Sequence, residues 1–95
     1  MRDERFEWDD AKAVANLKKH DISFEAARLG FDDSNPAEKD DPDPDEERRL
    51  ITGLANSVLL TVCYTERRNR IRIISARRAN RNEQDSYFTQ DQQDE

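Results

Sequence analysis

The sequence predicts an α+β fold with two N-terminal helices, an antiparallel sheet of about four strands and a short C-terminal helix. The helices are predicted because apolar residues recur with helical spacing between residues 10 and 31. The sheet is predicted because residues 50–75 hold three apolar segments separated only by turns, and such short connections favour antiparallel strands. A length of 95 residues predicts a single domain over 1–95.

The N-terminal part is expected to begin with a brief strand over residues 6–9 and a helix over residues 10–20. Asp9 is a suitable N-cap, and the cations at the other end of the helix suit the negative end of its dipole. One face of this helix is apolar and carries Ala11, Val14 and Leu17. Asp21 is expected in the turn that follows. A second helix begins at Ser23, and its apolar residues are Phe24, Ala27 and Phe31.

Residues 32–47 are expected to form an acidic loop, because they contain three prolines and nine acidic residues against one lysine. Within this loop, Asp41, Asp43 and Asp45 alternate as calcium ligands do. Neither the glycine nor the final glutamate of a calcium loop follows at the required spacing. The sequence therefore predicts no metal site and no cofactor.

The C-terminal half is expected to alternate strands with tight turns, with strands at 50–54, 58–64 and 70–75 and turns at 55–57 and 68–69. The middle strand is apolar enough to be buried on both faces, and Cys63 within it is expected to be a buried thiol. A helix over residues 80–88 and a polar tail over residues 89–95 complete the chain.

Charge is distributed unevenly along the chain. The net charge is -6, yet residues 67–81 contain seven arginines and no acidic residue. Guanidinium groups bind phosphate through two parallel hydrogen bonds, so this segment favours anion binding. Two alternatives fit the same charges. The arginines form a solvated surface, or they dock the chain's own acidic residues 38–47.

Several classes of protein are excluded. No stretch reaches the roughly 18 apolar residues of a membrane span, and no apolar run of the signal-peptide kind stands at the N-terminus. One cysteine and one histidine form neither an internal disulfide nor a Cys/His zinc site. A cytoplasmic protein is expected. Since Leu, Ile, Val and Phe number only 18, the chain would gain from a stabilising partner.

Several short motifs together resemble the BrnT family of toxins. They are Phe6-Glu7-Trp8-Asp9, Ala11-Lys12, Asn16-Leu17, Lys19-His20, Ser23-Phe24-Glu25-Ala26, Thr65-Glu66-Arg67 and Ile71-Arg72-Ile73-Ile74-Ser75-Ala76-Arg77. The likeness runs from about residue 6 to residue 87. It implies a RelE-like fold, in which the two helices pack on the sheet, and a ribonuclease toxin of a bacterial type II toxin–antitoxin pair. The implied partner is a BrnA-like ribbon-helix-helix antitoxin. The toxin would contact operator DNA only through this antitoxin. A dimer is one form that the toxin could take within the larger complex.

Metal-independent RNA cleavage needs a base, an acid and cations that stabilise the crowded phosphorane. The family motifs make Arg67 and Arg77 the leading cations, although the ends of antiparallel strands lie at opposite ends of a hairpin. His20 and Tyr87 are candidates for proton transfer. The residues expected to bind RNA are Lys19, Arg70, Arg72, Arg78 and Arg81.

Each of these residues also has a structural interpretation. Arg67 or Arg77 would serve in an ion pair with Glu66 or with an acid on a helix. His20 would cap the last carbonyls of its helix, and Tyr87 would pack beside Phe88. Trp8 is expected in the core rather than as a platform for stacking bases.

Two positions depart from the family pattern. Asp21 stands where family members commonly carry glycine, and Tyr64 stands where many carry histidine before Thr-Glu-Arg. The Tyr64 hydroxyl would be a weak substitute for the imidazole. These departures motivate an alternative function, a catalytically impaired toxin-like protein that binds the antitoxin as a co-repressor. A third hypothesis is a nucleic-acid mimic that binds a basic partner through residues 38–47.

Overall fold

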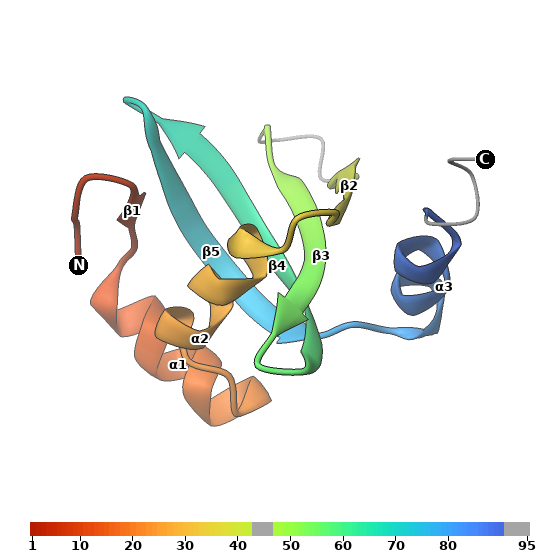
Figure 1. The fold of residues 1–95 in the computed structure, drawn as a ribbon. Helices are drawn as coiled ribbons and strands as arrows, with labels where there is room; N and C mark the ends of the chain where they lie inside the picture. The colour runs from red at the N-terminus through yellow and green to blue at the C-terminus, as the bar shows by residue number, and fades with distance from the viewer. Residues whose placement is uncertain (43–46, 91–95) are drawn as a thin grey trace.

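The structure is a computed structural model that describes residues 1–42 and 47–90. The elements are β1 (Phe6–Glu7), α1 (Asp10–His20), α2 (Phe24–Leu29), the 3₁₀ turn η1 (Gly30–Asp32), β2 (Ala37–Asp40), β3 (Arg49–Ala55), β4 (Val58–Arg67), β5 (Arg70–Arg78) and α3 (Arg81–Gln90). The strands form one sheet in the order β1-β5-β4-β3-β2 (Figure 1). β1 runs parallel to β5, and all other pairs are antiparallel. The predicted α+β class is confirmed, with five strands instead of about four.

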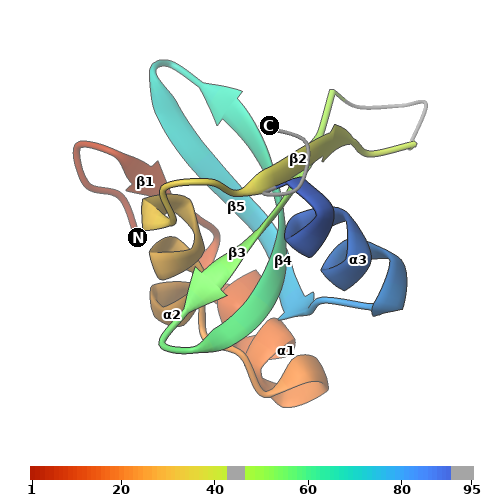
Figure 2. The same ribbon diagram turned by 45° about the vertical axis from the view of Figure 1, so that its right-hand side comes forward.

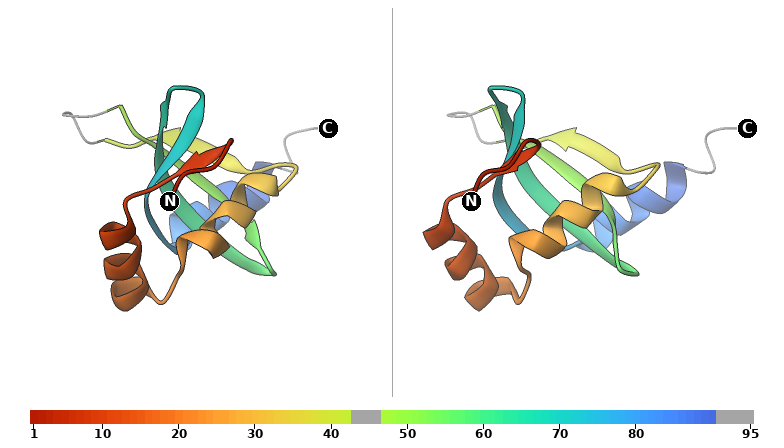
Figure 3. Two further views of the ribbon diagram at one scale, coloured as in Figure 1. Left: turned by 90° about the vertical axis from the view of Figure 1, so that its left-hand side faces the viewer. Right: turned by 60° about the vertical axis from the view of Figure 1, so that its left-hand side comes forward.

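The sheet lies between two layers of helix. α1 and α2 cover one face, and α3 lies against β2 and β3 on the other (Figures 2 and 3). The apolar core lies between the sheet and the first two helices, and its largest members include Phe6, Trp8, Phe24, Ile51, Leu60, Val62, Tyr64 and Ile73. Trp8 is 4% exposed, so its prediction as a core residue is confirmed. The side of the sheet away from this core is polar, and it is free of α1 and α2.

The expectation of a loop throughout residues 32–47 is wrong for residues 37–40, which form β2. This strand pairs with β3 from Ala37 opposite Thr52 to Asp40 opposite Arg49. An edge strand shows no apolar alternation when its side chains are exposed, so β2 cannot be recognised from the pattern of apolar residues. Asp43 and Asp45 lie outside the described residues. Within residues 1–42 and 47–90, no three candidate ligands gather as they would around a metal ion.

The boundaries of the other elements differ by a few residues from the predicted ones. The three central strands extend to β3, β4 and β5 as given above, and both predicted turns are confirmed. The turn residues have positive φ, as tight hairpins require: Asn56 and Ser57 in one turn, Arg68 and Asn69 in the other. Phe31 lies in η1 and not in α2, and Thr89 belongs to α3 and not to the tail.

The central strand β4 is buried as predicted, from Leu60 to Tyr64, and the thiol of Cys63 is buried with it. The two predicted ends of α1 are also confirmed. The Asp9 carboxylate accepts a hydrogen bond from the Lys12 backbone at 3.0 Å. Asp21 has a left-handed φ of 58° and its N–H bonds to Leu17. No helix in the described part of the chain is long and apolar enough to cross a membrane.

The apolar face of α1 points to solvent, because a polar residue holds the helix to the sheet. Val14 is 55% and Leu17 is 48% exposed, whereas Asn16 is 7% exposed. The Asn16 amide donates to the backbone oxygens of Ile22 and Ala76, both at 2.9 Å, and accepts from the Ala76 N–H at 3.1 Å. Three backbone groups that would otherwise be buried without partners are thereby satisfied.

Candidate nucleic-acid interface

A β-bulge brings two arginines of β5 to the same face of the sheet. Cys63 pairs with Ser75, but the next residue, Tyr64, pairs with Ile73, so Ile74 is an extra residue on β5. Arg72 and Arg77 are five positions apart and would point to opposite faces of a regular strand. The extra residue places both on the face that α1 and α2 leave uncovered. We call this surface the open face; it also carries Thr52, Thr61 and Thr65.

One part of the open face is a depression of about 360 Å³ that is lined by cations. We call it the cationic groove, and its lining residues are Lys12, Glu47, Arg48, Thr65, Arg67, Arg72 and Ile74. Four separate segments supply the cations, namely the first turn of α1, the residue before β3, the end of β4 and the start of β5. A surface of this kind attracts polyanions, because several cations surround one depression.

Neighbouring acids hold two of these arginines. Arg72 donates to Glu7 at 2.5 Å, and this hydrogen bond lowers the pKa of the Glu7 carboxyl. Arg48 forms an ion pair with Asp41 at 3.2 Å. Arg67 is exposed at the end of β4, and no side chain in the described part of the chain forms an ion pair with it. The groove therefore contains both anchored and solvent-exposed arginines.

Farther along the open face, a buried carboxylate fixes Arg77. The guanidinium forms two hydrogen bonds with Glu83 of α3, at 2.6 and 2.9 Å, and Glu83 is only 3% exposed. Glu83 also accepts from the Thr61 hydroxyl at 2.9 Å and from the Asn80 backbone at 2.8 Å. Thr52 bonds to the Thr61 hydroxyl at 2.7 Å. Burial alone would raise the pKa of Glu83, but these donors outweigh it and lower the pKa to about 2.

The four predicted catalytic residues do not meet at one point. Arg77 lies opposite Thr61 on β4, whereas Arg67 lies opposite Arg70 beside the hairpin turn. Six residues of strand separate the two positions, which is about 20 Å. Arg72, opposite Thr65, is closer to Arg77, at about 13 Å along the sheet. The structure therefore groups Arg67 with the groove and Arg77 with Glu83.

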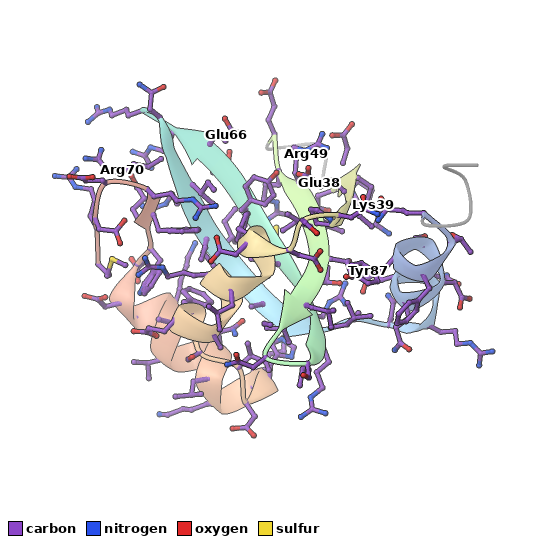
Figure 4. The ribbon with its side chains drawn as sticks, viewed as in Figure 1. Glu38, Lys39, Arg49, Glu66, Arg70 and Tyr87 are labelled. Carbon is purple, nitrogen blue, oxygen red and sulfur yellow. The ribbon has the colours of Figure 1, made fainter. Side chains whose placement is uncertain are left out.

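Tyr87 and His20 lie away from the groove. Tyr87 projects from the side of α3 that faces the sheet (Figure 4) and donates to Asp33 at 2.5 Å. Burial raises the pKa of Asp33, but hydrogen bonds from Tyr87, Asn35 and Leu54 outweigh it and lower that pKa. The Tyr87 ring also packs edge-on against Phe88, with 5.3 Å between centroids. His20 is the half-buried last residue of α1.

The residues predicted to bind RNA are also spread over the molecule. Arg72 lines the groove, whereas Arg70 donates through Nε to the Asp3 backbone at 2.7 Å and so holds the N-terminal segment. The other three are exposed, on α1, at the end of β5 and at the start of α3: Lys19, Arg78 and Arg81.

Tyr64 is buried on the helix-covered face and does not line the groove. Its side chain is 5% exposed, and its ring packs edge-on against Phe31 at 5.0 Å. The hydroxyl donates to Glu38 at 2.6 Å. Burial, together with this carboxylate, raises the pKa of Tyr64 to about 12. A phenol in this setting stays protonated near neutral pH.

Three described acids of residues 38–47 pair with arginines at or just before the start of β3. Arg49 lies 2.8 Å from Asp40 and 3.8 Å from Glu38 (Figure 4), and Arg48 pairs with Asp41. These acids therefore do not dock on the arginines of residues 67–81, as the alternative in the sequence analysis would require. Arg48 and Arg49 lie just outside that arginine segment, which is why the sequence did not single them out.

Sequence reasoning missed Lys12, Glu47, Arg48 and Glu83. The first three meet only because α1 and the segment before β3 fold beside the ends of β4 and β5. Glu83 did have a local signal. Asn80 and Glu83 form a capping box, in which each side chain accepts a hydrogen bond from the other residue's backbone. The pattern locates the start of α3, but it does not show that the same carboxylate binds Arg77.

Comparison with known proteins gives one result. The family model described as "Ribonuclease toxin, BrnT, of type II toxin-antitoxin system" matches residues 8–83, which is most of the chain. The match spans α1, α2, every strand of the sheet except β1, and the start of α3 with Glu83. No curated protein matches the chain.

Proposed function

The chain belongs to the BrnT family of type II ribonuclease toxins, and from this premise we propose that its open face binds and cleaves RNA without a metal ion. The observation that carries the proposal is the set of cations on one sheet face. Lys12, Arg67 and Arg72 surround one groove, and the bulge turns Arg77 to the same face. An RNA backbone crossing from the groove toward α3 would meet guanidinium groups along its path.

The reaction that suits this surface is attack by the RNA's own 2′-hydroxyl. A base takes the 2′ proton, the 2′ oxygen bonds to phosphorus, and the bond to the 5′ oxygen breaks as that oxygen receives a proton. The guanidinium groups of Arg67 and Arg72, which line the groove, stabilise the charge on the phosphorane, and Arg77 would contact another phosphate farther along the same RNA strand. Glu47 is the one carboxylate lining the groove in the described part of the chain, and we assign it the role of base.

The direct test is cleavage of a single-stranded RNA by the purified chain in the presence of EDTA. We expect cleavage by the native chain and at least a tenfold loss in Arg67→Gln, Arg72→Gln and Glu47→Gln. Arg5→Gln is the matched control, because Arg5 is exposed and pairs with Asp32 away from the groove. His20→Gln and Tyr87→Phe test the two other proton-transfer candidates. Intact RNA under all conditions would rule out the ribonuclease function of this chain.

We further propose that a protein antitoxin of ribbon-helix-helix type neutralises the toxin in the cytoplasm. Support comes from the family and from large apolar side chains that remain exposed, since protein partners cover such surface. The four most exposed of them are Val14, Leu17, Leu54 and Phe88. Co-expression with the product of the adjacent reading frame should give a stable complex and restore growth. Operator DNA should bind that complex and not the toxin alone.

One observation favours the second candidate function, an antitoxin-binding co-repressor without catalysis. The family histidine before Thr65 is replaced by Tyr64, whose buried hydroxyl is bonded to Glu38 and has a pKa of about 12. Tyr64 therefore stays protonated near neutral pH and does not act as a base in place of an imidazole. Operator binding by the complex, together with an inactive isolated chain, would favour the co-repressor. Recovery of cleavage in Tyr64→His would show that this replacement had removed the activity.

A further inference from the structure

Arg77 uses only part of its guanidinium in the pair with Glu83. Nη1 and Nη2 donate to the two carboxylate oxygens of Glu83, and Nη1 also donates to the Arg78 backbone at 3.3 Å. Nε makes no hydrogen bond with any residue that the structure describes. The Arg77 side chain is 38% exposed. The edge formed by Nε and the second proton of Nη2 therefore has no partner among the described residues, and it has the spacing that binds two oxygens of one phosphate.

The Glu83 carboxylate, in contrast, is almost fully buried. It receives hydrogen bonds from Arg77, from the Thr61 hydroxyl and from the Asn80 backbone, and it is 3% exposed. Four donor groups thus fix its two oxygens in position, counting both nitrogens of Arg77. A carboxylate so enclosed cannot touch an RNA strand, but it fixes the plane of the guanidinium that can.

We propose that Glu83 is the positioning residue of Arg77, holding one edge of the guanidinium so that the opposite edge presents two donors to an RNA phosphate. This inference rests on the proposed function, because it takes the open face as the RNA-binding surface. It assigns a role to α3, which supplies the Glu83 carboxylate. An arginine held on one edge loses little side-chain entropy when phosphate binds the other.

A purely structural ion pair would predict a different pattern. The pair would then fasten α3 to the sheet, and its loss would lower stability without changing how the remaining residues bind RNA. Binding and stability therefore separate the two roles. Arg77→Gln leaves the buried Glu83 carboxylate without its cation, so a second change, Glu83→Gln, should restore stability in that background.

The experiment is a double-mutant cycle on RNA binding, measured by fluorescence anisotropy with a single-stranded RNA that carries 2′-O-methyl groups and cannot be cleaved. We expect Glu83→Gln to weaken binding about tenfold in the native background and not at all in the Arg77→Gln background. Thermal melts of the same four proteins should show Arg77→Gln regaining stability when Glu83→Gln is added. Equal loss of affinity in both backgrounds, or no loss in either, would overturn the inference.

Arg77→Lys is the second variant, which tests the inference even if Glu83→Gln does not fold. Lysine keeps a positive charge beside Glu83, but its ammonium group lacks the two donor edges of a guanidinium, one for Glu83 and one for phosphate. Arg77→Lys should therefore bind the RNA about tenfold more weakly, and native affinity in this variant would overturn the inference. Cleavage of unmodified RNA is measured separately. Coupling without cleavage would contradict only the proposed ribonuclease function, and cleavage without coupling would contradict only the role of Glu83.

Discussion

At the scale of single residues, Glu83 makes the free energy of unfolding depend on pH. Its pKa of about 2 in the folded protein lies below the ordinary value of 4.5, so the folded chain binds the proton less readily than the unfolded chain. The resulting stabilisation is fully present above about pH 4.5 and is lost as the pH falls toward 2. This stabilisation is on the order of 3 kcal/mol.

This dependence is measured by urea unfolding at several pH values between 6 and 2.5. The native chain should lose more free energy of unfolding over this range than Glu83→Gln, because the variant has no carboxyl at this position. The comparison isolates Glu83 from the other carboxyls with lowered pKa values, which include Asp3, Glu7 and Asp33. Parallel curves for the two proteins would contradict the prediction.

Asn16 supports a second prediction at the same scale. Asn16→Ala removes the partners of two buried carbonyls and one buried N–H, so it should destabilise the fold by about 2–4 kcal/mol. Asn82→Ala is the control, because Asn82 is exposed on α3 and should change stability by less than about 0.5 kcal/mol. Chemical denaturation of both variants gives the difference. Similar stabilities would show that Asn16 does not hold α1 to β5.

At the scale of elements, the contact between η1 and β3 depends on a glycine. A Cβ at Gly53 would lie 2.4 Å from the Gly30 oxygen, so the backbone would have to move. Gly53→Ala should therefore cost about 2–3 kcal/mol. At Gly30, whose φ is −62°, the nearest atom to an added Cβ is 3.9 Å away, and Gly30→Ala should be nearly neutral. Melting curves of the two variants test this asymmetry, and equal losses would contradict it.

Elements were predictable where their signal is local. The N-cap at Asp9 and the hairpin turns at 56–57 and 68–69 can each be recognised from a few neighbouring residues. β2 was not predictable, because an edge strand with exposed side chains exists only through its pairing with β3. The orientation of α1 was not predictable either. Its apolar stripe predicts a face toward the core, but the hydrogen bonds of Asn16 to Ile22 and Ala76 determine which side meets the sheet.

The same distinction holds for the site. The arginine segment and its preference for anions can be recognised in the sequence, but the face to which each arginine points depends on the bulge at Ile74. The pair of Arg77 with Glu83 joins β5 to α3 and was foreseen only as an unspecified acid on a helix. The cationic groove needs residues from four segments, and no local pattern connects them.

At the scale of the whole molecule, the net charge of -6 conceals a local concentration of positive charge, because Lys12, Arg48, Arg67 and Arg72 line one groove. Binding of single-stranded RNA should weaken as salt rises, with a slope of log affinity against log salt of about −0.7 for each phosphate contacted. Arg67→Gln should make this slope shallower by about 0.7. Arg5→Gln should leave it unchanged. A slope unaffected by Arg67→Gln would place the RNA elsewhere on the molecule.

The outer strand of the sheet has a consequence for the behaviour of the free chain at high concentration. An unpaired strand edge invites the same strand of another molecule, which is how ordered aggregates grow. β2 presents Glu38, Lys39 and Asp40, all exposed, and Pro36 and Pro42 stand on either side of it. Pairing of β2 with β2 of a second molecule would bring like charges together. The pairing could not extend past the flanking prolines, because proline has no backbone N–H. The free chain would thus resist fibril formation along this side of the sheet.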